Sequence, residues 1–354
     1  MNRRTFLASG VAMLARNPPD VDLRRVAAKK NLLVGSAVSF RELHWPEFTE
    51  LLAKEANIVV AENDMKWQTI HPARDRYDFA PGDALVAFAT AHGQLVRGHN
   101  LCWHQAIPAW FPQTATPQNA ADLLHSHIAT VAGHYAGKIQ SWDVVNEAIH
   151  VDDGVPGGFR KSIWYQLLGP QYIDIAFRAA RQVDPHALLT YNDYGLEQDS
   201  PKAESKRQAV LGLLRSMRAR NIPIDALGIQ SHLHASNQPY EWAGLHRFLT
   251  ALEPLNLQVF VTELDVNDSA LPGDVAERDR AVADLYREYL HNVLMHPAVK
   301  AVLTWGLTDR DSWLNKFARR KDGQPVRPLP FDADLKPTSA YFAMREQITR
   351  APAR

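Results

Sequence analysis

The sequence of 354 residues contains a single cysteine, Cys102. One cysteine excludes an intrachain disulfide and any zinc or iron–sulfur site built from several cysteines. Cys102 lies in an apolar run that is typical of a strand. We therefore expect it to be a small buried residue rather than a reactive thiol.

The chain also has no excess charge, because 39 Lys and Arg residues balance 39 Asp and Glu residues. Nothing in this balance favours binding to nucleic acid or to an anionic membrane. The sequence has no low-complexity linker and no appended module. Its content of 46% hydrophobic and 22% charged residues is typical of a globular protein with one large core.

No hydrophobic run is long enough to span a bilayer. The N-terminus instead carries twin arginines, Arg3 and Arg4, before a short apolar segment, which resembles a twin-arginine export signal. We expect residues 1–25 to be an export leader and residues 26–350 to form one catalytic domain. The protein is then expected in the periplasm or outside the cell.

Eight apolar, β-rich runs alternate with amphipathic stretches after this leader. The predicted strands are Leu32–Ser39, Ile58–Asn63, Leu95–Trp103, Ile139–Glu147, Leu188–Tyr194, Ala226–Leu233, Gln258–Val266 and Val299–Thr308. The predicted helices include Trp45–Ala56, Ala120–Ala136, Tyr172–Val183, Ser205–Arg220 and Ala276–Met295, and the pair Pro81-Gly82 indicates a loop. The order predicts an α/β fold, a single (β/α)8 TIM barrel, with a doubly wound open sheet as the alternative.

Two of these runs carry a glutamate at or near their end, Glu147 and Glu263. The tip of a buried parallel strand is a poor place for a carboxylate in packing, but parallel α/β folds have their active sites at that edge. Two such carboxylates can divide the roles of acid and nucleophile in cleaving a glycosidic bond.

Nearly every predicted strand ends in polar or aromatic residues, and burying so many is costly unless they face a shared polar cleft. These strand ends resemble glycoside hydrolase family 10, the retaining endo-β-1,4-xylanases, from about residue 30 to about residue 348. The matching runs are Glu62-Asn63-Asp64-Met65-Lys66-Trp67, Gly98-His99-Asn100-Leu101-Cys102-Trp103-His104, Trp142-Asp143-Val144-Val145-Asn146-Glu147-Ala148, Tyr191-Asn192-Asp193-Tyr194, Gln230-Ser231-His232-Leu233, Thr262-Glu263-Leu264-Asp265, Thr304-Trp305-Gly306-Leu307-Thr308-Asp309 with Trp313, and Arg327-Pro328-Leu329-Pro330-Phe331-Asp332 with Lys336-Pro337.

The resemblance implies an endo-1,4-β-xylanase that acts on xylan or xylo-oligosaccharides as a monomer, without a cofactor or metal. It makes Glu147 the general acid/base and Glu263 the nucleophile. A retaining mechanism predicts carboxyl groups about 5–5.5 Å apart.

Supporting roles are implied by the same match. Asn146 resembles the residue that binds the sugar 2-hydroxyl, and Gln230 the partner of Glu147. His232 is expected to hydrogen-bond Glu263, with Asp265 orienting the imidazole. The implied sugar contacts are Lys66 and His99 at −1, Glu62 and Asn63 at −2, Trp103, Trp305 and Trp313 on the glycone side, and Tyr194 near +1.

One departure concerns the run Trp103-His104-Gln105-Ala106, where the family commonly has a sugar-binding glutamine at the position of Ala106. Glycone-side binding is expected to differ there. Glu62 and Lys66 also have the spacing of a surface pair on a helix. Two other functions stay open, a related barrel glycosidase on cellulose or mixed-linkage β-glucan and a non-catalytic polysaccharide-binding barrel.

Overall fold

Eight parallel strands close into one barrel in the structure, a computed structural model that describes residues 22–354. The strands are β1 (Leu33–Val38), β2 (Ile58–Ala61), β3 (Leu95–Cys102), β4 (Ser141–Asn146), β5 (Leu188–Asp193), β6 (Ala226–Ile229), β8 (Gln258–Asn267) and β9 (Val299–Thr304). The pairings β1–β9 and β6–β8 close these eight strands into a ring. The predicted (β/α)8 barrel is confirmed, and the open-sheet alternative is wrong.

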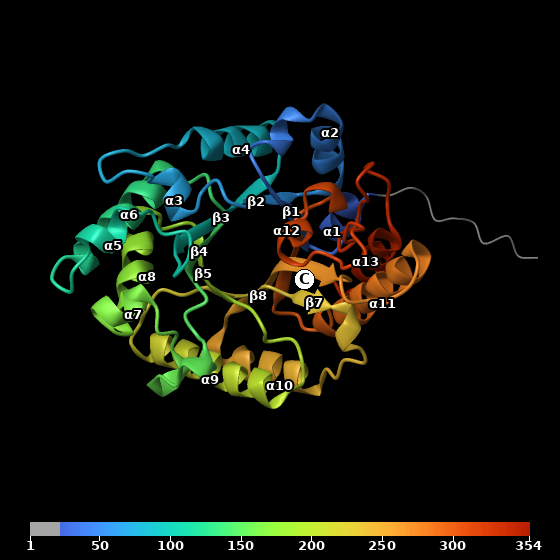
Figure 1. Ribbon diagram of the computed structural model, residues 1–354. Coiled ribbons are helices and arrows are strands. Elements are labelled where there is room, and N and C mark those ends of the chain that lie inside the picture. Colours follow the sequence, from blue (N-terminus) through green and yellow to red (C-terminus); the bar gives the residue numbers. More distant parts are fainter. Residues whose placement is uncertain (1–21) are drawn as a thin grey trace, which may run out of the picture.

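Helices surround this barrel (Figure 1). The longer ones are α2 (Pro46–Glu55), α4 (Ala80–Ala91), α6 (Ala120–His134), α8 (Gln171–Val183), α9 (Pro201–Ala219), α10 (Ala243–Leu252), α11 (Val275–Val293) and α13 (Ser339–Arg350). The short ones are α1 (Leu23–Ala28), α3 (Trp67–Ile70), α5 (Phe111–Thr114), α7 (Ile163–Leu168) and α12 (Leu314–Phe317). Among the described residues, none of these helices combines the length and apolar character needed to cross a membrane.

Local sequence explains where the long helices begin. The side chain of Ser200 accepts a hydrogen bond from the Ala203 amide, with Pro201 in the first turn of α9. The side chain of Asp274 caps α11 in the same way, accepting from the Glu277 amide.

The pair Pro81-Gly82 is not a loop, so that prediction is wrong. Both residues lie in the first turn of α4, where the missing proline N–H costs nothing. A Cβ at residue 82 would lie 2.2 Å from the Tyr135 hydroxyl, so the helix needs a glycine there to pack closely.

The predicted strand Ala226–Leu233 is divided into β6 and a short strand, β7 (His232–His234), which pairs with the end of β8. Ser231 separates them with a φ of 66°, in the left-handed region that non-glycine residues rarely adopt. Strand patterning cannot reveal this bend, because the residues on both sides of it favour β structure.

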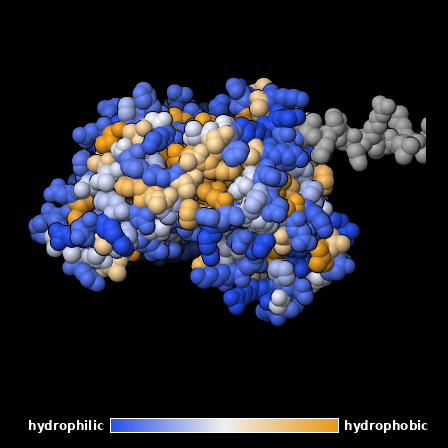
Figure 2. Space-filling model, turned by 90° about the horizontal axis from the view of Figure 1, so that it is seen from above, coloured by the Kyte–Doolittle hydropathy of each residue, from blue (hydrophilic) through white to orange (hydrophobic). Residues whose placement is uncertain are grey.

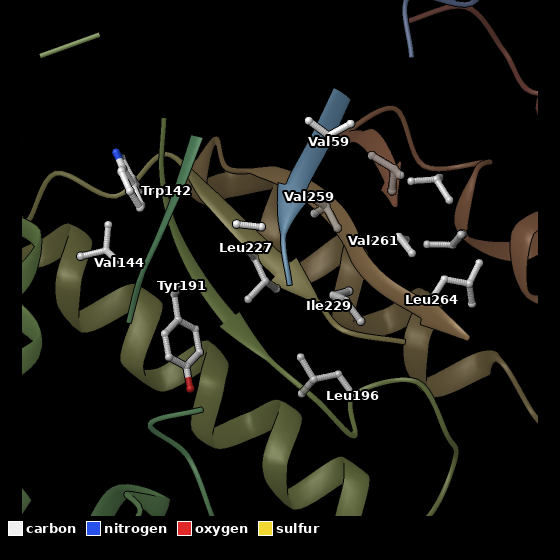
Figure 3. Close-up of a cluster of buried hydrophobic side chains, with 14 of the residues drawn as sticks. Val59, Trp142, Val144, Tyr191, Leu196, Leu227, Ile229, Val259, Val261 and Leu264 are labelled. Carbon is white, nitrogen blue, oxygen red and sulfur yellow. The ribbon is translucent and has the colours of Figure 1, made fainter. Parts of the chain in front are cut away.

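Strand side chains alternate between two layers of core. Ile58, Val60, Ala226, Phe260 and others form a cluster inside the barrel. The intervening residues belong to the larger cluster beneath the helices, as Leu227, Ile229, Val259 and Val261 show in Figure 3. Burial on both faces explains why the strands are continuously apolar.

The surface facing the viewer in Figure 2 is mostly hydrophilic, with apolar residues gathered in a band across its middle. Cys102 is buried, as expected. The twin arginines of the predicted leader lie outside the described residues. The predicted boundary at residue 25 falls inside α1, whose first turn is capped by Asp22.

Candidate active site

A cleft of about 1440 Å³ opens at the rim where the strands end. Every predicted site residue except Asp265 lines it, namely Glu62, Asn63, Lys66, His99, Trp103, Asn146, Glu147, Tyr194, Gln230, His232, Glu263, Trp305 and Trp313. Asp265 is buried behind His232, with its Oδ1 2.9 Å from the ring Nδ1. The barrel therefore brings the predicted residues together around one cleft.

Glu147 directly follows β4 and is held on several sides. Its Oε1 accepts hydrogen bonds from Gln230 Nε2 at 3.0 Å and from Asn146 Nδ2 at 3.3 Å. Its φ of 58° is left-handed, a conformation that costs about 1–3 kcal/mol in a non-glycine residue. Two hydrogen bonds hold it there, from the Glu147 amide to Asn192 O at 2.9 Å and from Arg160 Nε to Glu147 O at 2.8 Å.

The surroundings of Glu147 favour its protonated form. Burial raises the pKa of this carboxyl above its usual 4.5, and the hydrogen bond from Gln230 only partly opposes the rise. The negative charges of Asp193 and Glu263 raise this pKa further. Glu147 thus keeps its proton to a higher pH than an exposed glutamate does, as a general acid requires.

His104 lies close to the same carboxyl, with Nδ1 3.9 Å from Glu147 Oε2. Burial, followed by the charge of Arg160, lowers the pKa of His104 to about 3. The imidazole is therefore neutral and contributes no positive charge that would favour ionised Glu147.

Glu263, in the second half of β8, is held ionised. Its Oε1 accepts from Asn192 Nδ2 at 2.7 Å, and its Oε2 lies 3.2 Å from His232 Nε2. Burial alone would raise the pKa of Glu263, but the hydrogen bond from His232, the positive field of His99 and His232 and the Asn192 bond together lower it.

His232 is the partner that most favours the ionised form of Glu263. Burial would lower the pKa of its imidazole, but the charge and hydrogen bond of Asp265, with those of Glu263, raise it well above 6.5. Asp265 Oδ2 accepts a further hydrogen bond from Trp313 Nε1 at 2.7 Å. The predicted His232–Asp265 support of Glu263 is therefore present in the geometry.

Asn192, on β5, links Asn146 to the Glu263 carboxyl group, a role that the sequence patterns did not predict. Its Nδ2 donates to Asn146 Oδ1 at 2.9 Å and to Glu263 Oε1 at 2.7 Å, while its Oδ1 accepts from Thr262. A Cβ on Gly228 would lie 2.2 Å from that Oδ1, so the neighbouring strand must present a glycine. The only sequence signal was its place in a polar strand end.

His99 at the cleft floor is fixed from inside the barrel. Its Nδ1 lies 2.9 Å from Asp143 Oδ2, and the other oxygen of Asp143 pairs with Arg97. Arg97 is buried and also donates to Ser141 Oγ at 2.9 Å. A charged residue within an apolar strand was the sequence signal for this group.

Lys66 and the tryptophans line the predicted glycone side. Lys66 Nζ lies 5.1 Å and 5.7 Å from the ring centroids of Trp103 and Trp305, and it donates to Asn63 Oδ1 at 2.8 Å. Residues 62–66 lie in a loop before α3, so the alternative of a Glu62–Lys66 pair on a helix is wrong.

Tyr194, on the opposite side, is fixed by two cations. Its hydroxyl accepts from Arg160 at 2.9 Å, and Lys206 Nζ lies 3.5 Å from the ring centroid. Lys206 also pairs with Asp193 Oδ1 at 2.7 Å. One face of the ring is thus occupied by a cation. Sequence patterns gave no sign of Arg160 or Lys206, because their contacts with Tyr194 arise from tertiary packing.

Gln105 and Ala106 both line the cleft. Ala106 has a left-handed φ of 52°, and its carbonyl accepts from the Gln68 amide at 2.7 Å. Gln68 lines the cleft as well, so two glutamines flank the position where the sequence has alanine.

Within residues 22–354, no group of three or more His, Cys, Asp or Glu side chains is arranged to hold a metal ion. The cleft instead offers one carboxyl favoured as an acid and one held as an anion. A protonated carboxyl can give a proton to a leaving group, and an ionised one can attack an electrophilic carbon.

Comparison with known proteins places this chain among described relatives. Residues 22–347 match the family described as glycosyl hydrolase family 10. Endo-1,4-beta-xylanase B of Thermotoga neapolitana is 36% identical over 92% of this chain and 91% of its own. Native xylanase 10B of Thermotoga maritima has a TM-score of 0.85 at 35% identity, covering 93% of this chain and 98% of that one. Xylanase 10B of Thermotoga petrophila, solved with xylobiose, also gives 0.85 and 35%, covering 94% and 99%.

The role of Asn192 can be tested by titration. In Asn192→Ala the pKa of Glu263 should rise, because one of the hydrogen bonds that favours its ionised form is lost. The pKa of Glu147 should change less, since Asn192 does not bond its carboxyl group. Carboxyl titration by NMR measures both pKa values. An unchanged pKa of Glu263 would show that the Asn192 bond does not keep this residue ionised.

Proposed function

Because this chain belongs to glycosyl hydrolase family 10, we propose that it hydrolyses internal β-1,4 linkages of xylan by a retaining double displacement. Glu147 is the acid/base and Glu263 the nucleophile. One observation carries the proposal: two carboxyl groups line one cleft with different partners, amide groups for Glu147 and the His232 imidazole with an amide for Glu263. These surroundings displace the two pKa values in opposite directions, upward for Glu147 and downward for Glu263. Such a divergence is what separate acid and nucleophile roles require.

In the first step, Glu147 gives its proton to the glycosidic oxygen while that oxygen leaves with the bonding electrons. A Glu263 oxygen attacks the anomeric carbon and forms a glycosyl ester. Asn146 and Gln230 hold the Glu147 carboxyl during the transfer. His232 and Asn192 keep Glu263 ionised until it attacks.

The ester changes the electrostatics of the cleft. Charge on Glu263 raises the pKa of Glu147, and the ester removes that charge. The pKa of Glu147 therefore falls, and the residue can take a proton from water that attacks the anomeric carbon. Glu263 then leaves as a carboxylate. Two inversions give net retention.

The two roles predict different losses. In Glu147→Ala, turnover of xylan should fall by about 10²–10⁴-fold. Cleavage of an aryl glycoside with a good leaving group should be partly retained, because that group needs little protonation. Glu263→Ala should lose both activities. Product release from arabinoxylan measures the first activity, and the kinetics of aryl xylobioside cleavage measure the second.

Azide and a remote variant sharpen the test. Azide should rescue Glu147→Ala with retained configuration and Glu263→Ala with inverted configuration. Glu50→Ala, on an exposed position of α2, should match the wild type. Intact xylan cleavage by Glu263→Ala would refute the assignment.

The sugar preference rests on the glycone lining. Trp305 and Trp313 resemble a wall that leaves no room for the hydroxymethyl group of glucose, and relatives of this chain are named endo-1,4-beta-xylanases. We expect kcat/KM for aryl xylobioside to exceed that for aryl cellobioside by about tenfold or more. Equal values would favour a β-glucan substrate.

We also propose that the twin arginines at positions 3 and 4 direct export of the folded chain. In the full chain, replacing Arg3 and Arg4 together by lysine should leave total xylanase activity unchanged and move it from the exported fraction to the cytoplasm. Exported activity equal to the wild type would contradict this route.

A further inference from the structure

The bend between β6 and β7 aims two residues at two different carboxyl groups. Gln230 Nε2 donates to Glu147 Oε1 at 3.0 Å, and His232 Nε2 lies 3.2 Å from Glu263 Oε2. Residues two apart in a regular strand point the same way. The left-handed Ser231 between them breaks that rule, so the positions of Gln230 and His232 depend on one residue.

Ser231 is buried and held by several hydrogen bonds, one of them from its hydroxyl to Ile229 O at 3.1 Å. Its amide donates to Glu197 Oε1 at 2.8 Å, and its hydroxyl lies 2.6 Å from the Tyr289 hydroxyl on α11. Its carbonyl accepts from the Asp265 amide at 3.4 Å. The Glu197 contact satisfies an N–H that would otherwise be unpaired in the interior.

Glu197 has no part in the proton transfers described above. It follows β5, lies within reach of the cleft lining, and is only 2% exposed. The charged groups that face it are His232 and Lys206, and the Tyr289 phenol is also near. Burying a carboxyl group is costly unless it is paired or hydrogen-bonded, and the Ser231 amide supplies one such bond here.

We propose that Glu197 is a positioning residue, whose hydrogen bond to the Ser231 amide sets the Gln230–Glu147 and His232–Glu263 contacts together. This inference rests on the proposed function. Glu197 touches neither substrate nor a reacting atom in this scheme. It acts on both carboxyl groups through the bend.

Loss of the hydrogen bond between Glu197 and the Ser231 amide should change the pH profile in a specific way. The Gln230 bond lowers the pKa of Glu147, and the His232 bond lowers the pKa of Glu263. Loosening both bonds raises both pKa values. The acid limb and the basic limb of kcat/KM should therefore move together toward higher pH.

The experiment compares E197A, E197Q, Y289F and Y286F in the full chain, with kcat, KM and the pH profile on aryl xylobioside and with Tm. E197A should lose about 10- to 100-fold in kcat at little change in KM, because catalytic groups are displaced. E197Q keeps an acceptor for the Ser231 amide and should recover most of that loss. Y289F should shift activity in the same direction by a smaller factor.

Y286F is the matched control, since Tyr286 is also a buried tyrosine on α11 but bonds Pro328 O. It should keep wild-type kcat and pH limbs. If E197A does not fold, the test uses Y289F, in which both limbs of the pH profile should also move toward higher pH. The proposal would be overturned if E197A had the wild-type kcat and the wild-type acid and basic limbs of the pH profile. Where E197A is unfolded, the same result in Y289F would overturn it. E197Q as impaired as E197A would also overturn it, because charge rather than the hydrogen bond would then matter.

Crystal structures separate this inference from the proposed function. In E197A, the Gln230–Glu147 and His232–Glu263 distances should exceed hydrogen-bond range, whatever sugar the enzyme cleaves. If these distances are unchanged in E197A, only the positioning role of Glu197 is overturned. If they lengthen but the wild type does not cleave xylan, only the xylanase assignment is overturned.

Discussion

Closure of the barrel is the constraint on which the cleft depends. The β1–β9 and β6–β8 pairings join the strands into one ring in which every neighbour is parallel. All strands then end at the same rim. Glu147 and Glu263, far apart in the chain, meet there because β4 and β8 are separated around the ring only by β5 and β6. Asn192 on β5 is therefore in the right place to bond Asn146 on one side and Glu263 on the other.

The same ring encloses charge as well as apolar side chains. Arg97 and Asp143 pair inside the barrel, where both are almost wholly buried, and Phe260 packs against the guanidinium at 5.2 Å. A buried ion pair is tolerated when further hydrogen bonds satisfy it. Here the pair extends to His99, so packing within the barrel and orientation at the cleft floor are parts of one network.

The sequence predicted the barrel and most lining residues because those features have strong local signals. Apolar β-branched runs mark the strands, and polar residues at their tips mark the rim. Helix α4 was missed because the pair Pro81-Gly82 is typical of a turn. In the structure the glycine is needed inside the helix, because it packs against Tyr135. The Ser231 bend and the contacts of Arg160 and Lys206 arise from tertiary packing, which no spacing along the chain records. Roles for individual residues came from family resemblance, not from pattern.

The lone thiol of Cys102 has a practical consequence. It is buried in β3, and burial raises its pKa well above the usual 9.0, so it is shielded and poorly nucleophilic. A cysteine introduced at an exposed position on the rim would be the one thiol open to maleimide or spin-label reagents. The unmodified chain is thus ready for site-specific labelling, and distances across the cleft could be followed during turnover without first removing a native cysteine.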